Sequence, residues 1–302
     1  IRDRIRLARL PLAAAVDQRY ELLIQSLAWR QVEAGATWLL VDMGPQRRDS
    51  APDMAWLVQT IHDAVRIPLV LRSDDPSAME AGMEVAKERV LLDATLPGIS
   101  KPEPYLALAQ RHKVKLALSA CPGGLPLPTE DRIERVTGVL LPSALEAGLA
   151  LEDLYVDPLV TALSCDQPAV PATVETLRLL KVAADPAPNT LIHLDDVADG
   201  AADAAKPFIT QALLAMALAA GLDALVANPL DADLMDVLRV VRERDPAVAY
   251  DQLLVRLFDV TKADVELDVA SVDLTDPAQA SLYKTVQVLN NKLIYADSYL
   301  SG

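Results

Sequence analysis

The chain has 302 residues, of which 52% are hydrophobic, and its 43 acidic and 28 basic side chains give a formal net charge of -15. This excess of negative charge repels nucleic acid and anionic membrane surfaces, so we expect neither as a partner. No segment approaches the roughly 20 uninterrupted apolar residues of a membrane-spanning helix, and the two cysteines form no CxxC pair, so we expect a cytoplasmic protein without a disulfide framework or structural zinc site.

Short apolar segments of strand length alternate along the chain with longer amphipathic segments. The strand-like segments are one near residues 1–7, then 38–41, 69–71, 90–92, 114–118, 154–156, 191–194 and 224–227. The helix-length segments include 54–65, 102–112, 133–147, 174–184 and 208–220. Apolar strands that alternate with helices indicate a parallel sheet covered on both faces. Eight such units predict an α/β fold of the (β/α)8 TIM barrel type, with residues 1–302 as a single domain.

The alternative is a doubly wound open sheet. That fold is disfavoured because no GxGxxG follows the first strand and because eight units suit a closed barrel better.

Polar side chains follow nearly every predicted strand. They include Asp42, Arg72, Asp93, Asp157, Asp195, Asp196 and Asn228. In a barrel the carboxyl ends of all strands meet at one mouth, where barrel enzymes place their sites. We therefore expect these side chains to converge there.

Residues 244–275 do not fit the repeat. They contain an amphipathic piece at 250–258 and an alternating acidic stretch, and a closing helix is predicted at 278–293. We interpret 244–275 as an insertion in the last barrel unit that serves as a dimer contact, as a cover for the barrel or as a substrate lid. Its apolar residues need cover, which favours a homodimer.

Three segments carry a resemblance to a known family. They are EDLYVDPL at 152–159, ADPAPNTL at 184–191 and LLAMALAAGLD at 213–223. In this order and spacing they resemble the methyltetrahydrofolate:corrinoid protein methyltransferases, whose pterin-binding barrel is also that of dihydropteroate synthase. The resemblance covers residues 1 to about 236 and resumes at 288–298, so only the insertion lies outside it.

The resemblance implies that a pterin ring lies across the barrel mouth. Asp157 stands in the family's Asp-Pro motif and is implied to accept hydrogen bonds from the pterin, although a carboxylate paired with Arg72 is an equal alternative. Asp196 takes the place of an asparagine beside the methyl-bearing nitrogen, so it is the predicted catalytic residue, and it can act as an acid only when protonated. Lys206 stands where the family has an arginine and can neutralise an anion.

Two further positions depart from the family pattern. Arg72 replaces an aspartate that accepts from the pterin, and a guanidinium has only donors. Asp93 replaces an asparagine, and so loses a donor. Arg72 can instead pair with Asp93 or Asp157, or bind an anionic group of another ligand. With Asp42 and Asn228 at the other strand ends, these residues complete the predicted substrate-binding set.

The resemblance leaves three functions open. The first is a divergent enzyme that moves a methyl group from methyltetrahydrofolate, or a related pterin, to a corrinoid protein whose cobalamin is carried by that partner. The second is a noncatalytic barrel that has lost the pterin site and docks a corrinoid protein or binds another small anion. The third is a dihydropteroate synthase, for which a lysine and Ser-x-Arg signature is missing.

A metal site and a thiol nucleophile are not expected. His62, His112 and His193 are far apart in the sequence, and His193 is interpreted as a packed or capping side chain. Arg72 among the carboxylates argues against a bound divalent cation. Cys121 has no neighbouring histidine to activate it.

Overall fold

The computed structural model describes residues 2–6, 10–44 and 50–300. In it, eight parallel strands close into a barrel in sequence order, β1 to β8, each beside the next and β8 beside β1. The strands are β1 Arg2–Arg6, β2 Trp38–Asp42, β3 Leu69–Arg72, β4 Val90–Ala94, β5 Lys115–Ser119, β6 Leu154–Asp157, β7 Asn189–His193 and β8 Ala224–Val226. The predicted TIM barrel is thereby confirmed, with every predicted strand present.

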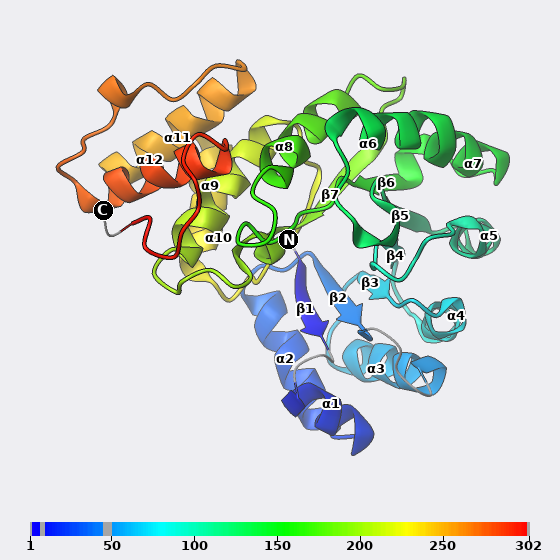
Figure 1. The fold of residues 1–302 in the computed structure, drawn as a ribbon. Helices are drawn as coiled ribbons and strands as arrows, with labels where there is room; N and C mark the ends of the chain where they lie inside the picture. Colours follow the sequence, from blue (N-terminus) through cyan, green and yellow to red (C-terminus); the bar gives the residue numbers. More distant parts are fainter. Residues whose placement is uncertain (1, 7–9, 45–49, 301–302) are drawn as a thin grey trace.

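Helices follow the strands around the barrel (Figure 1). They are α1 Leu10–Asp17, α2 Glu21–Glu33, α3 Ser50–Ala64, α4 Pro76–Val85, α5 Glu103–His112, α6 Thr129–Arg135, α7 Leu141–Glu146, α8 Ala169–Leu180, α9 Lys206–Ala219, α10 Ala232–Glu243, α11 Ala249–Lys262 and α12 Pro277–Leu289. A π-helical turn, Val136–Leu140, joins α6 to α7. Among the helices in these described ranges, none is long and apolar enough to cross a membrane.

Aspartates fix the starts of three helices. The side chains of Asp75, Asp231 and Asp276 accept hydrogen bonds from backbone N–H groups in the first turns of α4, α10 and α12. Such caps satisfy donors that have no partner inside the helix, and proline at the first position of α4 and α12 costs nothing because its N–H is missing. The helix boundaries are therefore written in local sequence.

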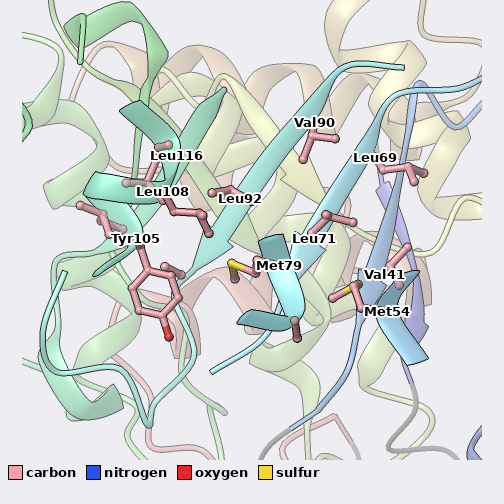
Figure 2. Packing of buried hydrophobic residues seen from close by; sticks show 14 of the residues in the cluster. Val41, Met54, Leu69, Leu71, Met79, Val90, Leu92, Tyr105, Leu108 and Leu116 are labelled. Atoms are coloured by element: carbon pink, nitrogen blue, oxygen red, sulfur yellow. The ribbon is translucent and has the colours of Figure 1, made fainter. Parts of the chain in front are cut away.

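Alternate side chains of each strand face opposite sides of the sheet. Val41, Leu71 and Leu92 point outward and pack with Met54 of α3, Met79 of α4 and the side chains of α5 (Figure 2). The residues between them point inward and form a separate buried layer of Leu40, Val70, Leu91, Ala117, Leu191 and Val226. The strands are apolar on both faces because the helices cover one face and the opposite strands cover the other.

Close packing of α3 and α4 depends on a small residue. A Cβ atom added at Gly82 would lie 2.8 Å from side-chain atoms of Leu71 and Met54. Only glycine therefore lets α4 approach β3 and α3 at this distance.

The segment predicted as an insertion forms α11 and the loop after it, and α11 and α12 both pack against α9 (Figure 1). Leu253, Leu254 and Leu257 of α11 are buried within this chain. Helix α9 therefore covers these three leucines, whereas Val265, Val269 and Leu274 of the same segment are exposed. Homodimerisation stays a prediction.

Candidate functional site

The polar residues of the mouth occupy one register of the strands. Two residues after each inward-facing apolar side chain, the next inward position holds Asp42, Arg72, Asp93, Ser119, Asp157 or His193. Asp42 pairs with Arg72 and Arg72 with Asp93 across the strands β2, β3 and β4. Because alternate side chains of a strand point inward, the inward-facing side chains change from apolar to mostly polar or charged at the carboxyl ends of the strands.

Arg72 lies between two carboxylates. Its Nη1 is 3.2 Å from Asp42 Oδ2, and its Nε is 3.6 Å from Asp93 Oδ2. All three side chains are buried, with at most 7% of any of them exposed. Burial alone would lower the pKa of Arg72, but Asp93 and Asp42 raise it above its ordinary value. The guanidinium is therefore charged and shared between its neighbours.

The structure decides between the two partners predicted for Arg72. Its ion pairs within the described residues are with Asp42 and Asp93, and none is with Asp157. The prediction of a pair with Asp93 is confirmed, and the alternative that Asp157 is the partner is wrong. Asp42 lies on the adjacent strand in register with Arg72, which brings it within reach.

Asp93 also contacts a histidine from the far side of the barrel. His193 Nε2 lies 3.1 Å from Asp93 Oδ2. The other oxygen of Asp93 accepts from the backbone N–H of Thr95 at 3.1 Å and from its hydroxyl at 2.7 Å. Burial alone would raise the pKa of Asp93, but His193, Arg72 and these hydrogen bonds hold it well below the usual range. Asp93 is therefore an ionised carboxylate, stabilised by ion-pair contacts at one oxygen and by hydrogen bonds from Thr95 at the other.

Asp157, at the end of β6, has different surroundings. One oxygen accepts from the backbone N–H of Leu159 at 2.8 Å, and within the described residues no cation lies within ion-pair distance. Burial raises the pKa of Asp157 to about 7, and the nearby Asp93 and Asp196 act in the same direction against Leu159 and Arg72. This carboxyl can therefore exchange a proton near neutral pH.

Asp196 lies in the short 3-10 helix Leu194–Ala198 that follows β7, and its side chain is partly buried. It is close enough to act electrostatically on both Arg72 and Asp157. The structure thus places the predicted catalytic carboxyl at the rim of the same mouth. Its catalytic role stays a prediction.

Lys206 and Asn228 are placed apart from these charges. The ammonium of Lys206, at the start of α9, is 2.7 Å from the exposed Asp203. The amide oxygen of Asn228, just after β8, accepts from the backbone N–H of Leu230 at 3.0 Å. Neither side chain contacts the buried charges within the part of the chain that the structure describes.

His193 is the residue whose role the sequence analysis underestimated. It was interpreted as a packed or capping side chain, but its buried ring touches Asp93 and lies 3.4 Å from the hydroxyl of Thr95. The signal was available, because His193 stands two residues after the inward-facing Leu191, as Asp93 does after Leu91. Strand period, rather than residue type, identifies it.

Cys121 follows β5 and lies next to the backbone just after Asp157. Its thiol is fully buried, and burial raises its pKa. Its Sγ is 3.6 Å from the carbonyl oxygen of Pro158, so it is a weak donor to the backbone next to Asp157. A protonated, enclosed thiol of this kind is a poor nucleophile. Among the residues described, no group of three or more His, Cys, Asp and Glu is arranged to hold a metal ion.

Comparison with known proteins finds similarity to curated proteins and to many solved structures. No family model matches the chain. The chain is 24% identical over 227 residues to a methylcorrinoid:tetrahydrofolate methyltransferase of Eubacterium limosum, and the match covers 73% of this chain and 81% of that protein.

Several of the similar solved structures are dihydropteroate synthases. The enzyme of Xanthomonas albilineans, in complex with 7,8-dihydropteroate, has a TM-score of 0.59 at 16% identity and covers 74% of this chain and 84% of its own. The enzyme of Thermus thermophilus has a TM-score of 0.55 at 18% identity, with 73% and 87% covered. This likeness is one of fold, and it confirms that the barrel is of the dihydropteroate synthase type.

Proposed function

We propose that this chain binds a reduced folate at the barrel mouth and transfers a methyl group between that folate and a corrinoid protein. The observation that carries the proposal is Asp157, a buried carboxyl at the end of β6 that forms no ion pair with the described residues and has a pKa of about 7. The similarity to the methyltransferase of Eubacterium limosum supports the reaction class.

Asp157 has the chemistry that a pterin requires. The amino group and ring N–H of a pterin are donors, so they need an acceptor in a site that excludes water. Arg72 forms ion pairs with Asp42 and Asp93 but not with Asp157. When a donor edge approaches, the carboxyl can lose its proton and accept, because its pKa lies near neutral pH.

Asp196 is the proposed acid and base at the methyl-bearing nitrogen. It lies at the rim, near Asp157 and Arg72, where a side chain reaches a ligand laid across the mouth. The relative's name gives transfer from a methylcorrinoid to tetrahydrofolate, the reverse of the direction that the sequence resemblance implies. One group serves both directions, since it donates the proton in one and accepts it in the other.

The remaining predicted residues take supporting roles in this proposal. Lys206 is exposed on the first turn of α9 and would neutralise an anionic part of the folate outside the buried mouth. Asn228 would need to give up its bond to Leu230 to read the pterin edge. The corrinoid stays on the partner protein and supplies the cobalt that carries the methyl group.

Calorimetry with methyltetrahydrofolate tests the proposal. We expect the wild-type chain to bind it and Asp157→Asn to bind it at least about tenfold more weakly, because a strong buried acceptor is lost. Asp153→Asn is the matched control, since Asp153 immediately precedes the same strand at the opposite end of the barrel and its ion pair within the described part of the chain is with Lys115. Equal affinity of all three proteins would contradict the role of Asp157.

The role of Asp196 has its own test. Asp196→Ala should leave folate binding nearly unchanged while it slows methyl transfer to free cob(I)alamin by roughly a hundredfold or more. A variant that transfers at the wild-type rate would remove Asp196 from the chemistry.

The second candidate is a noncatalytic barrel that docks a corrinoid protein or binds another small anion. The contact of Arg72 with Asp42 and Asp93 favours it, because two of the predicted pterin acceptors are already engaged. The variant Arg72→Gln separates the candidates. If wild type does not bind methyltetrahydrofolate and Arg72→Gln does, Arg72 blocks the pterin site. If neither protein binds methyltetrahydrofolate, the noncatalytic barrel is favoured.

A further inference from the structure

A fully buried arginine lies behind the mouth, on α6. Arg132 has no exposed surface. Its Nε donates to the carbonyl of Leu127 at 2.7 Å and its Nη1 to the hydroxyl of Thr173 at 3.1 Å, while Nη2 has no hydrogen-bond partner in the described structure. No carboxylate of the described residues lies within ion-pair distance of it. A buried charge without a counter-ion costs stability, so packing alone does not account for Arg132.

Thr173 connects this arginine to the backbone after β6. It lies on α8, and its hydroxyl donates to the carbonyl oxygen of Leu159 at 2.7 Å. The carbonyl of Ala169, one turn earlier on the same helix, is 3.0 Å from the hydroxyl and competes for its hydrogen. The hydroxyl accepts from Nη1 of Arg132 and has one hydrogen to donate, and Leu159 is the nearer of its two acceptors.

Leu159 is held in an unusual conformation. Its φ is 73°, in the left-handed region that a leucine rarely adopts. Its N–H donates to Asp157, its carbonyl accepts from Thr173, and the carbonyl of the preceding Pro158 lies 3.6 Å from the thiol of Cys121. Both peptide groups of Leu159 are thus fixed from outside, as a strained residue requires.

We propose that Arg132 and Thr173 are positioning residues for Asp157: they hold Leu159 in its left-handed conformation, which aims its N–H at the carboxyl in the mouth. The inference rests on the proposed function in taking Asp157 as the group that meets the folate. The hydrogen-bond chain Arg132, Thr173, Leu159, Asp157 runs from α6 through α8 to the end of β6.

The chain acts on the proton affinity of Asp157. The N–H of Leu159 stabilises the ionised carboxylate, and so lowers a pKa that burial raises. Other ionisable groups also act on Asp157, among them Arg72 on β3, Asp93 on β4 and Asp196 after β7, and Arg132 and the thiol of Cys121 are close enough to interact with it electrostatically. A loosened Leu159 should therefore raise the pKa of Asp157 without any change in these charges.

The test replaces the hydroxyl of Thr173 and reads the pKa of Asp157 by NMR of carbon-13-labelled aspartate in the full chain. Thr173→Val should raise that pKa by about half a unit to one unit, the effect expected when one hydrogen bond to the carboxylate weakens. Thr173→Ser keeps the hydroxyl and should give the wild-type value. Thr176→Val is the matched control, because Thr176 is also buried on α8 but, among the described residues, its hydroxyl bonds only to Ala172 of its own helix.

An Asp157 pKa that is the same in Thr173→Val, Thr176→Val and wild type would overturn the proposal. If Thr173→Val does not fold, the pair Thr173→Ala and Thr176→Ala makes the same comparison with smaller side chains. Titration with methyltetrahydrofolate separates the two proposals. If Thr173→Val raises the pKa of Asp157 but the wild-type chain binds no folate, the positioning role stands and the proposed function is rejected. If the wild-type chain binds folate but Thr173→Val leaves the pKa of Asp157 unchanged, the proposed function stands and the positioning role is rejected.

Discussion

The two sides of the barrel mouth shift the pKa of a buried aspartate in opposite directions. On the side formed by β2, β3 and β4, Asp93 meets Arg72 and His193, and its pKa lies well below the usual range. On the side formed by β6, Asp157 meets one backbone N–H, and burial raises its pKa to about 7. Both side chains are almost completely buried, so the difference comes from the neighbours and not from depth.

The contrast indicates a division of labour within one mouth. Titratable groups whose surroundings push their pKa values apart are typical of sites in which one group is fixed as an anion and another exchanges a proton. On the Asp93 side the carboxylates of Asp42 and Asp93 share the guanidinium of Arg72, and Asp93 also contacts His193, so this side offers less to a ligand. Asp157 forms no ion pair with the described residues and its pKa lies near neutral pH, so we expect a ligand to bind on its side of the mouth.

Removal of Arg72 should break the comparison with the largest effect. Arg72→Met leaves Asp42 and Asp93 buried without the cation that lies between them, which should cost roughly 3–5 kcal/mol of unfolding free energy in a urea titration at neutral pH. Arg244→Met is the control, because Arg244 forms a bidentate pair with Asp259 at 2.7 and 2.9 Å on the exposed surface and should be almost neutral. Similar losses for both variants would mean that the buried cluster is not dry.

The pH dependence of stability should separate the two aspartates. The pKa of Asp157 in the folded chain, about 7, lies above the ordinary value, so its contribution to stability is complete below about pH 4 and is lost as the pH rises through 7. Between these limits wild type should lose up to about 4 kcal/mol relative to Asp157→Asn.

Urea unfolding at about pH 5 and about pH 8.5 measures the larger part of this difference, roughly 2.5–3 kcal/mol, because some of it is already lost at pH 5. Asp153→Asn, at the other end of β6, should follow wild type. The low pKa of Asp93 has the opposite sign: its stabilising contribution is present above the ordinary pKa and is lost only in acid. A parallel pH profile for wild type and Asp157→Asn would show that Asp157 is an ordinary carboxylate.

Thiol reactivity should sharpen the comparison with the smallest effect. Cys121 is buried beside the Asp157 side of the mouth with a raised pKa, whereas Cys165 is exposed. In the native chain a thiol reagent should modify Cys165 quickly and Cys121 slowly, since the reactive thiolate of Cys121 is both rare and enclosed. Cys165→Ser should abolish the fast phase. A fast phase that survives would show that water reaches this side freely.

The sequence by itself determined the barrel and the composition of its mouth. Alternating apolar strands and helices predict eight parallel strands, and the structure has all of them. A polar residue two positions after an inward-facing apolar one must also point inward, so Asp42, Arg72, Asp93 and Asp157 could be assigned to one end of the barrel from local pattern alone. These features are local, because the strand period and the helix caps are read from neighbouring residues.

Only the tertiary structure decided which of these side chains meet. Arg72 chooses Asp42 and Asp93 because their strands lie in register beside β3, while His193 reaches Asp93 from β7 across the barrel interior. The support of Asp157 by Arg132 and Thr173 joins α6, α8 and the end of β6, which no local pattern connects. Charges so close in a dry interior set each other's pKa, so the chemistry of the mouth depends on contacts between residues far apart in the chain.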